Sequence, residues 1–136
     1  MTLKVVKKEY KAFVSDLIVK EGNLNLLYKV KNVSLQLISH LELSYNGIID
    51  RLNILSRYQN KKASLKDLKR ESNQLLREAK KETDIIKSNL LWAVMYAISS
   101  VKRKSNLEYA FYFLIVALAS ELSKSEIDDA LANLKI

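Results

Sequence analysis

The sequence predicts an all-α protein, a compact helical bundle of about five helices with one long central helix. The chain has no proline and only two glycines, so it lacks the residues that tight turns between strands require. Apolar residues recur at steps of three and four along most of the chain, which is the period of an amphipathic helix. The length of 136 residues is enough to bury a core without disulfides, and we expect a single helical domain over residues 1–136.

The first helix is predicted over Thr2–Glu21. Its apolar residues fall on one face of a helix, and they are Leu3, Val6, Tyr10, Phe13 and Leu17. Gly22 is expected to end this helix, because glycine readily adopts the left-handed conformation that commonly closes a helix.

A second apolar stripe starts at Leu24 and keeps its phase as far as Leu55. The Asn46-Gly47 dipeptide lies within it and is a strong turn signal. A helix that continued through Gly47 would lose about 1 kcal/mol relative to alanine. The pattern leaves both possibilities open. A continuous helix would allow another backbone to approach closely at Gly47.

The long central helix is predicted from Ser64 to Val101. Ser64 is expected to cap its start, with Asp67 completing a capping box. The first half is crowded with charge, whereas residues 90–98 carry none. An unbroken helix of this length would extend about 55 Å, so we expect one end to project or to pair with a partner.

Two further helices are predicted near the C-terminus. Capping-box patterns at Ser105–Glu108 and Ser123–Glu126 indicate where they begin, the first at Asn106. The segment Tyr109–Ala119 is apolar all round, which is typical of a buried helix. Together with residues 90–98 it is expected to form the core.

The chain is basic, with a formal net charge of +8. Residues 1–104 carry 21 Lys and Arg against 10 Asp and Glu, whereas residues 105–136 carry 2 against 5. A field of this sign favours association with polyanions such as nucleic acid.

The strongest functional candidate is a row of cations at helical spacing on the first half of the central helix. We call it the basic stripe, and it consists of Lys62, Lys66, Lys69, Arg70, Arg77, Lys80 and Lys81. Such a row can lie along a phosphate backbone. It can also be an ordinary solvated face, since Asp67, Glu71, Glu78 and Glu82 are interleaved and can pair with Arg70 and Lys81.

Two other basic clusters accompany the stripe. Lys102, Arg103 and Lys104 have no acidic neighbour before Glu108. They suit phosphate contacts or, in the interpretation we favour, the negative end of a helix dipole. The N-terminal lysines at positions 4, 7, 8 and 11 form the third cluster, and packing decides whether the three share one surface.

Aromatic residues could stack on unpaired bases, but most lie within apolar runs rather than among the lysines. These are Trp92, Tyr96, Tyr109, Phe111, Tyr112 and Phe113, and we expect them in the core or at a subunit interface. Tyr28 and Tyr58 are the expected exposed aromatics.

The sequence gives little support for an enzyme, for a bound cofactor or for a membrane-spanning segment. There is one histidine, His40, no cysteine, and too few glycines for a phosphate-binding loop, so we expect neither an enzyme nor a bound cofactor or metal. The two uncharged runs are about half of the roughly 20 residues that span a bilayer. The N-terminus lacks the apolar core of a secretory signal, which predicts a cytoplasmic protein.

These patterns favour a non-catalytic nucleic-acid-binding protein or a small subunit of a nucleoprotein complex, with largely non-sequence-specific phosphate contacts to DNA or RNA. A homo-oligomer or a protein partner is also expected. The alternative is a scaffold subunit whose long helix docks to a partner through its apolar stripe, with no nucleic-acid role. In gross character only, the chain is similar to small helical subunits of ribonucleoprotein assemblies and to nucleic-acid-binding proteins of archaeal viruses.

Overall fold

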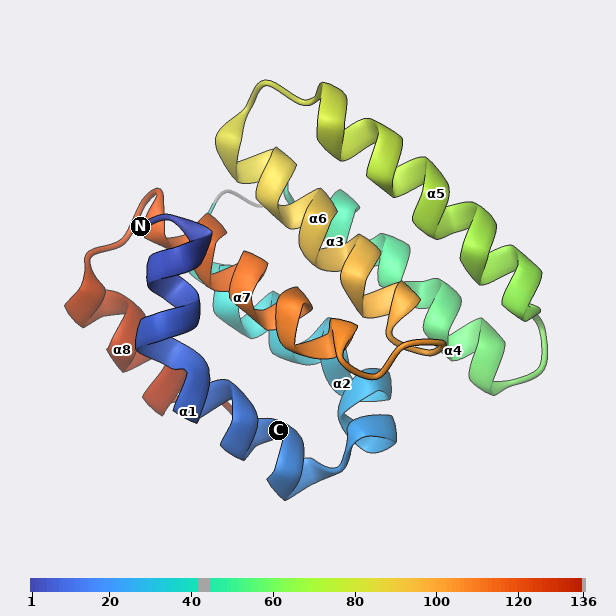
Figure 1. The fold of residues 1–136 in the computed structure, drawn as a ribbon, viewed down its shortest axis with the longest axis horizontal. Coiled ribbons are helices and arrows are strands. Elements are labelled where there is room, and N and C mark those ends of the chain that lie inside the picture. Colours follow the sequence, from blue (N-terminus) through green and yellow to red (C-terminus); the bar gives the residue numbers. More distant parts are fainter. Residues whose placement is uncertain (42–44, 136) are drawn as a thin grey trace.

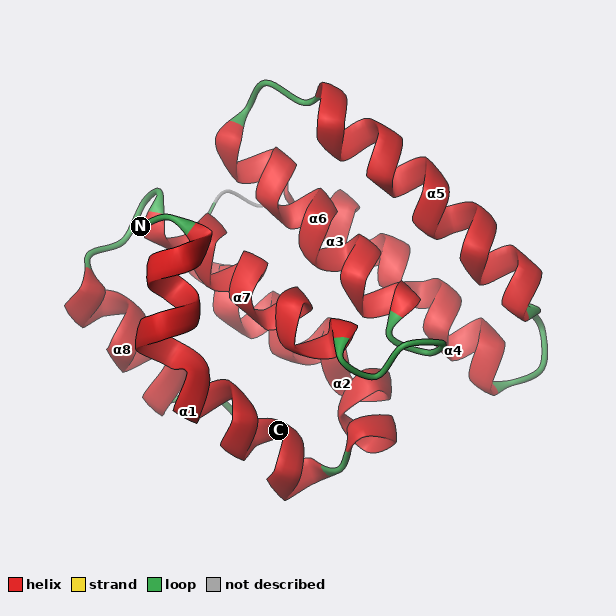
Figure 2. Cartoon of the chain, viewed as in Figure 1, coloured by secondary structure: helices red, strands yellow, loops and turns green. Residues whose placement is uncertain are grey.

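The computed structural model describes residues 1–41 and 45–135, without the side chains of Asn23 and His40. All regular structure within these ranges is helical, which confirms the all-α prediction (Figure 2). The helices are α1 (Leu3–Glu21), α2 (Asn23–Leu37), α3 (Asn46–Ile49), α4 (Asn53–Gln59), α5 (Leu65–Lys81), α6 (Ile85–Ser99), α7 (Asn106–Ala119) and α8 (Lys124–Ala132), with 3₁₀ segments at Ile38–His40 and Asp50–Leu52.

The helices pack in two layers (Figure 1). Helices α5, α6, α7 and α1 lie side by side in one layer. Behind them, α2 packs against α7, α3 against α6, and α4 against α2 and α5. Helix α8 packs beside α1 and the end of α7. Helix α6 makes its most extensive contacts with α7 and α5, so it occupies the middle of the fold.

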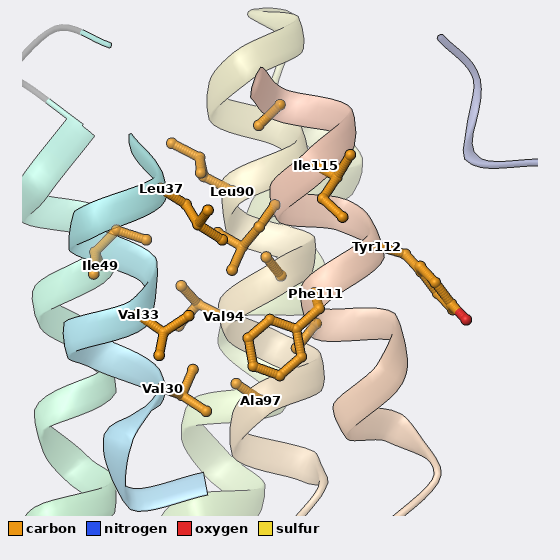
Figure 3. Close-up of a cluster of buried hydrophobic side chains, with 14 of the residues drawn as sticks. Val30, Val33, Leu37, Ile49, Leu90, Val94, Ala97, Phe111, Tyr112 and Ile115 are labelled. Carbon is orange, nitrogen blue, oxygen red and sulfur yellow. The ribbon is translucent and has the colours of Figure 1, made fainter. Parts of the chain in front are cut away.

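The core lies where α6 and α7 meet α2 (Figure 3). Phe111 of α7 lies beside Val94 of α6 and points toward Val33 of α2, and Leu90 faces Leu37 in the same cluster. Both α6 and α7 are apolar around most of their circumference and are buried accordingly. The expectation that residues 90–98 and 109–119 form the core is therefore confirmed.

The prediction of a single long central helix is wrong. The predicted helix is two helices, because α5 ends at Lys81 and α6 folds back along it (Figure 1). Glu82 adopts an extended backbone, and the Asp84 carboxylate accepts a hydrogen bond of 3.0 Å from the Lys87 amide to cap α6. Folding back allows α6 to cover the apolar face of α5, which a straight helix would leave in water. The count of about five helices is too low, because this predicted helix is two helices and the second predicted helix is three, namely α2, α3 and α4.

The second predicted helix also breaks, but before the Asn46-Gly47 dipeptide. Helix α2 ends at Leu37, and Leu41 has an extended backbone. Asn46 begins α3, so Gly47 lies within a short helix. Among the described residues, a Cβ atom added to Gly47 would meet no atom outside its own helix within 4 Å, so none of their backbones approaches closely there.

The predicted capping boxes are confirmed at two places and wrong at one. Ser64 and Ser123 form the expected capping boxes. Thr2, for which no cap was predicted, also caps α1. Gly22 ends α1 with a φ of 76°. Ser105 has a helical backbone and makes no side-chain cap bond. A capping serine needs an extended backbone to direct its hydroxyl at the helix amides.

None of the helices in residues 1–41 and 45–135 combines the length and the apolar character needed to cross a membrane.

Candidate nucleic-acid interface

The basic stripe occupies the outer face of α5. The opposite face of this helix is buried against the rest of the chain through Leu68, Leu75 and Ala79. Six of the seven cations lie on α5 and Lys62 lies in the turn before it, and all seven are exposed. Because α5 is at the edge of its layer (Figure 1), this face is open along its whole length.

Two carboxylates of α5 point away from the stripe and bind Arg51. The Arg51 Nε atom lies 2.8 Å from Glu71 Oε1, and its Nη2 atom lies 2.8 Å from Glu78 Oε2. Burial would lower the pKa of the Arg51 guanidinium, but the hydrogen bonds to Glu78 and Glu71 outweigh it and raise the pKa. Arg51 therefore holds Glu71 and Glu78 on the side of α5 that faces the 3₁₀ segment Asp50–Leu52 and offsets one of their two negative charges.

The other two carboxylates serve the ends of α5. Asp67 accepts a hydrogen bond of 2.8 Å from the Ser64 amide, and this bond lowers the pKa of Asp67. Asp67 also lies 3.8 Å from Arg70, and among the described residues this is the one ion pair that a stripe cation makes. Glu82 accepts from the Asp84 amide at 3.2 Å. On an ordinary solvated face, these four carboxylates would form ion pairs with the cations of the basic stripe. Most of their contacts are instead with Arg51 and with backbone amides at the ends of α5.

A groove between α5 and α6 joins the stripe to the second basic cluster. It has a volume of about 520 Å³ and lies between the first half of α5 and the turn that follows α6. Lys66 and Lys69 line one side, and Lys102 and Arg103 line the other. These four cations come from segments more than 30 residues apart in the sequence, and only the fold-back of α6 brings them together.

The floor of the groove is apolar. It is formed by side chains of α5, α6 and the turn after α6, namely Leu68, Leu76, Met95, Ile98 and Val101. None of the described residues that line the groove is acidic. The site therefore combines an apolar floor with a positively charged rim, which suits an anionic ligand that has an apolar part.

Lys104 and the N-terminal lysines do not join this groove. Lys104 lines a separate hollow of about 230 Å³ with Tyr28 and Tyr58, and both tyrosines are half-buried rather than exposed. On α1, Lys7 donates a hydrogen bond of 3.0 Å to the Tyr109 hydroxyl, which raises the pKa of Lys7. Helices α6 and α7 separate α1 from α5 (Figure 1), so the three basic clusters do not form one surface.

The aromatic residues divide between the core and a half-buried cluster. Phe111 and Tyr112 are buried as expected. Trp92, Tyr96 and Phe113 stack on one another with ring centres 5.5 to 6.1 Å apart, but all three remain partly exposed. Their positions on the outer side of α6 and α7 could not be read from apolar runs alone.

The part of the chain that the structure describes contains no group of three or more His, Asp or Glu side chains placed to hold a metal ion. Comparisons with protein-family models, with curated proteins and with solved structures find no match for this chain.

Proposed function

We propose that this chain is a non-catalytic nucleic-acid-binding protein, acting alone or as a small subunit of a nucleoprotein complex. Phosphates would contact the basic stripe on α5, with Lys102, Arg103 and Lys104 of the turn after α6 in support. The observation that carries this proposal is the binding of Glu71 and Glu78 by Arg51, which leaves the outer face of α5 with little negative charge.

The geometry of α5 suits contacts to a phosphate backbone. Its exposed cations form two groups, at residues 66–70 and 77–81, and the seven residues from Arg70 to Arg77 are two turns, or about 10 Å, along a helix. Each neutralised phosphate releases counterions, so the affinity should fall steeply with salt. Long lysine and arginine side chains that meet phosphates carry no information about base sequence, and the binding should therefore be largely non-specific.

Docking of a protein partner through the apolar stripe of α5 is the competing proposal. The residues it would need are already buried in the chain's own core, with Leu75 fully buried and Leu68 and Ala79 at most 4% exposed. Presenting them to a partner would require α5 to leave α6. The structure thus supports the outer, charged face of α5 over its apolar face as the functional surface.

The test measures binding of generic single- and double-stranded DNA and RNA by fluorescence anisotropy at several salt concentrations. For the wild type we expect a steep linear fall of log affinity with log salt. Combined Arg70→Glu, Arg77→Glu and Lys81→Glu replacements should remove binding at moderate salt. They should leave the cooperative unfolding transition in place, because all three side chains are exposed.

The matched control carries three charge reversals on α1, Lys8→Glu, Lys11→Glu and Lys20→Glu, which change the net charge equally. These lysines are also exposed but lie at the opposite edge of the layer. The control should retain most of the affinity. Equal loss in both variants would mean that net charge alone drives the association, and absence of any binding by the wild type at low salt would overturn the proposal.

A further inference from the structure

Ser72 is the unusual group in the α5–α6 groove. It is 9% exposed and lines the groove from the buried side of α5. Its hydroxyl oxygen has no hydrogen-bond partner among the described residues, although serines within helices often bond to the carbonyl one turn earlier. A buried hydroxyl without a partner is unfavourable. The oxygen is closed to solvent, so a ligand in the groove would remove that cost by bonding to the hydroxyl once the Ser72 side chain has rotated toward it.

Further hydrogen-bonding groups lie along the same lining. Asn106 donates to the Ser99 hydroxyl at 3.0 Å, and that hydroxyl donates to the Tyr96 carbonyl at 3.1 Å. These bonds fix the side chains of Ser99 and Asn106 where α6 approaches α7. The groove thus presents ordered polar groups above an apolar floor, in the arrangement that sites for small planar molecules commonly have.

The composition of the groove selects among anionic ligands. Inorganic phosphate would use the cationic rim but leave the apolar floor uncovered. An acyl chain would cover the floor but leave the Ser72 hydroxyl without a partner. A nucleobase has two apolar faces and a hydrogen-bonding edge, and its backbone carries phosphates on either side. The volume of about 520 Å³ lies within the range of roughly 300–1,000 Å³ typical of such sites.

We propose that this groove receives one unpaired nucleobase of a single-stranded nucleic acid, with its flanking phosphates at Lys66 and Lys69 on one side and Lys102 and Arg103 on the other. This inference rests on the proposed phosphate-binding function and adds to it a preference for single strands. The bases of a duplex are stacked and paired, so they could reach the groove only after extrusion.

The experiment compares three fluorescein-labelled probes with the full chain at low salt. They are a 12-nucleotide oligothymidylate, a strand of the same length and charge in which every nucleotide is abasic, and a 12-base-pair duplex. Contact of one base with aliphatic side chains should contribute a binding free energy at the low end of the range for base stacking. We therefore expect the thymidylate to bind about tenfold more tightly than the abasic strand.

Two groove variants and one control locate the base-dependent part of the binding. Leu76→Trp fills the groove and should abolish the difference between the thymidylate and the abasic strand. Ser72→Ala removes only the hydroxyl, so it should fold normally and reduce that difference about threefold. Lys80→Ala lies on the same helix outside the groove and should weaken binding of both strands by the same factor.

The outcomes separate this inference from the proposed function. Equal binding of the thymidylate and the abasic strand would overturn the groove as a base site while leaving phosphate binding by α5 intact. A tenfold difference that persisted in both Leu76→Trp and Ser72→Ala would also overturn it, since the base would then bind elsewhere. Failure of all three probes to bind would overturn both proposals.

Discussion

Arg51 Nε lies 2.8 Å from the Glu71 carboxylate, across the seam between the 3₁₀ segment Asp50–Leu52 and α5. The same guanidinium holds Glu78 two turns further along the helix. The partly buried Arg51 guanidinium therefore forms ion pairs with two carboxylates. Without Arg51, these carboxylates would be free to pair with the lysines and arginines of α5. The electrostatic character of the outer face of α5 depends on a residue that lies on another element.

Replacing Arg51 with methionine should affect both stability and binding. The side chains of this network are only partly exposed, so the free energy of unfolding should fall by about 1–2 kcal/mol. The released Glu71 and Glu78 carboxylates should weaken oligonucleotide affinity about threefold at low salt. Lys29→Met is the control, because Lys29 makes an exposed pair with Glu21 away from α5. An unchanged affinity in Arg51→Met would show that the two carboxylates do not influence the stripe.

Two of the three serines predicted to cap helices should respond differently to alanine. Ser64 accepts a hydrogen bond from the Asp67 amide at 3.2 Å, so Ser64→Ala should cost about 1 kcal/mol in urea unfolding. Ser105 makes no cap bond, and Ser105→Ala should leave the unfolding free energy nearly unchanged. A similar cost for both substitutions would contradict the caps described here.

The two glycines should respond to alanine with opposite signs. Gly22 has a φ of 76°, where a Cβ atom is strained, so Gly22→Ala should destabilise the fold by about 1–2 kcal/mol. Gly47 is helical with open space around it, and Gly47→Ala should stabilise by about 0.5–1 kcal/mol. Thermal unfolding of the two variants measures both, and a loss of stability in Gly47→Ala would point to a contact absent from the structure.

Stability should fall in alkaline solution through Tyr10. Burial, and then the hydrogen bond of 2.9 Å to Asp128, raise the pKa of the Tyr10 phenol above its usual value. In the unfolded chain the pKa of this phenol is about 10. Its contribution is therefore complete below about pH 10 and is lost as the pH rises toward the higher folded pKa.

Urea unfolding of wild type and Tyr10→Phe between pH 7 and pH 11 tests this linkage. At pH 7 the substitution should cost about 1 kcal/mol for the lost hydrogen bond. The gap between the two proteins should narrow above about pH 10, while Tyr112, whose pKa burial also raises, contributes equally to both. A gap that stayed constant up to pH 11 would show that Tyr10 does not titrate differently in the folded protein.

The spacing of apolar residues predicted which segments are helical, but it did not predict that the central helix ends at Lys81. The apolar line from Leu68 through Thr83 to Val101 keeps one phase through the break, so the pattern looks continuous. Thr83 is exposed and lies outside both helices. The local sequence did contain a sign that a new helix starts at this point. Asp84 precedes two isoleucines, and aspartate is strongly preferred as the N-cap of a helix.

The sequence by itself determined the all-α class, the caps at Ser64 and Ser123 and the outward direction of the basic stripe. These properties depend on residues within one or two helical turns of each other. Only the tertiary structure decided that α6 folds back on α5, that Arg51 binds Glu71 and Glu78, and that Lys66 and Lys69 share a groove with Lys102 and Arg103. Those relationships join residues far apart in the chain, and they are set by which apolar faces can be buried together, which local patterns do not encode.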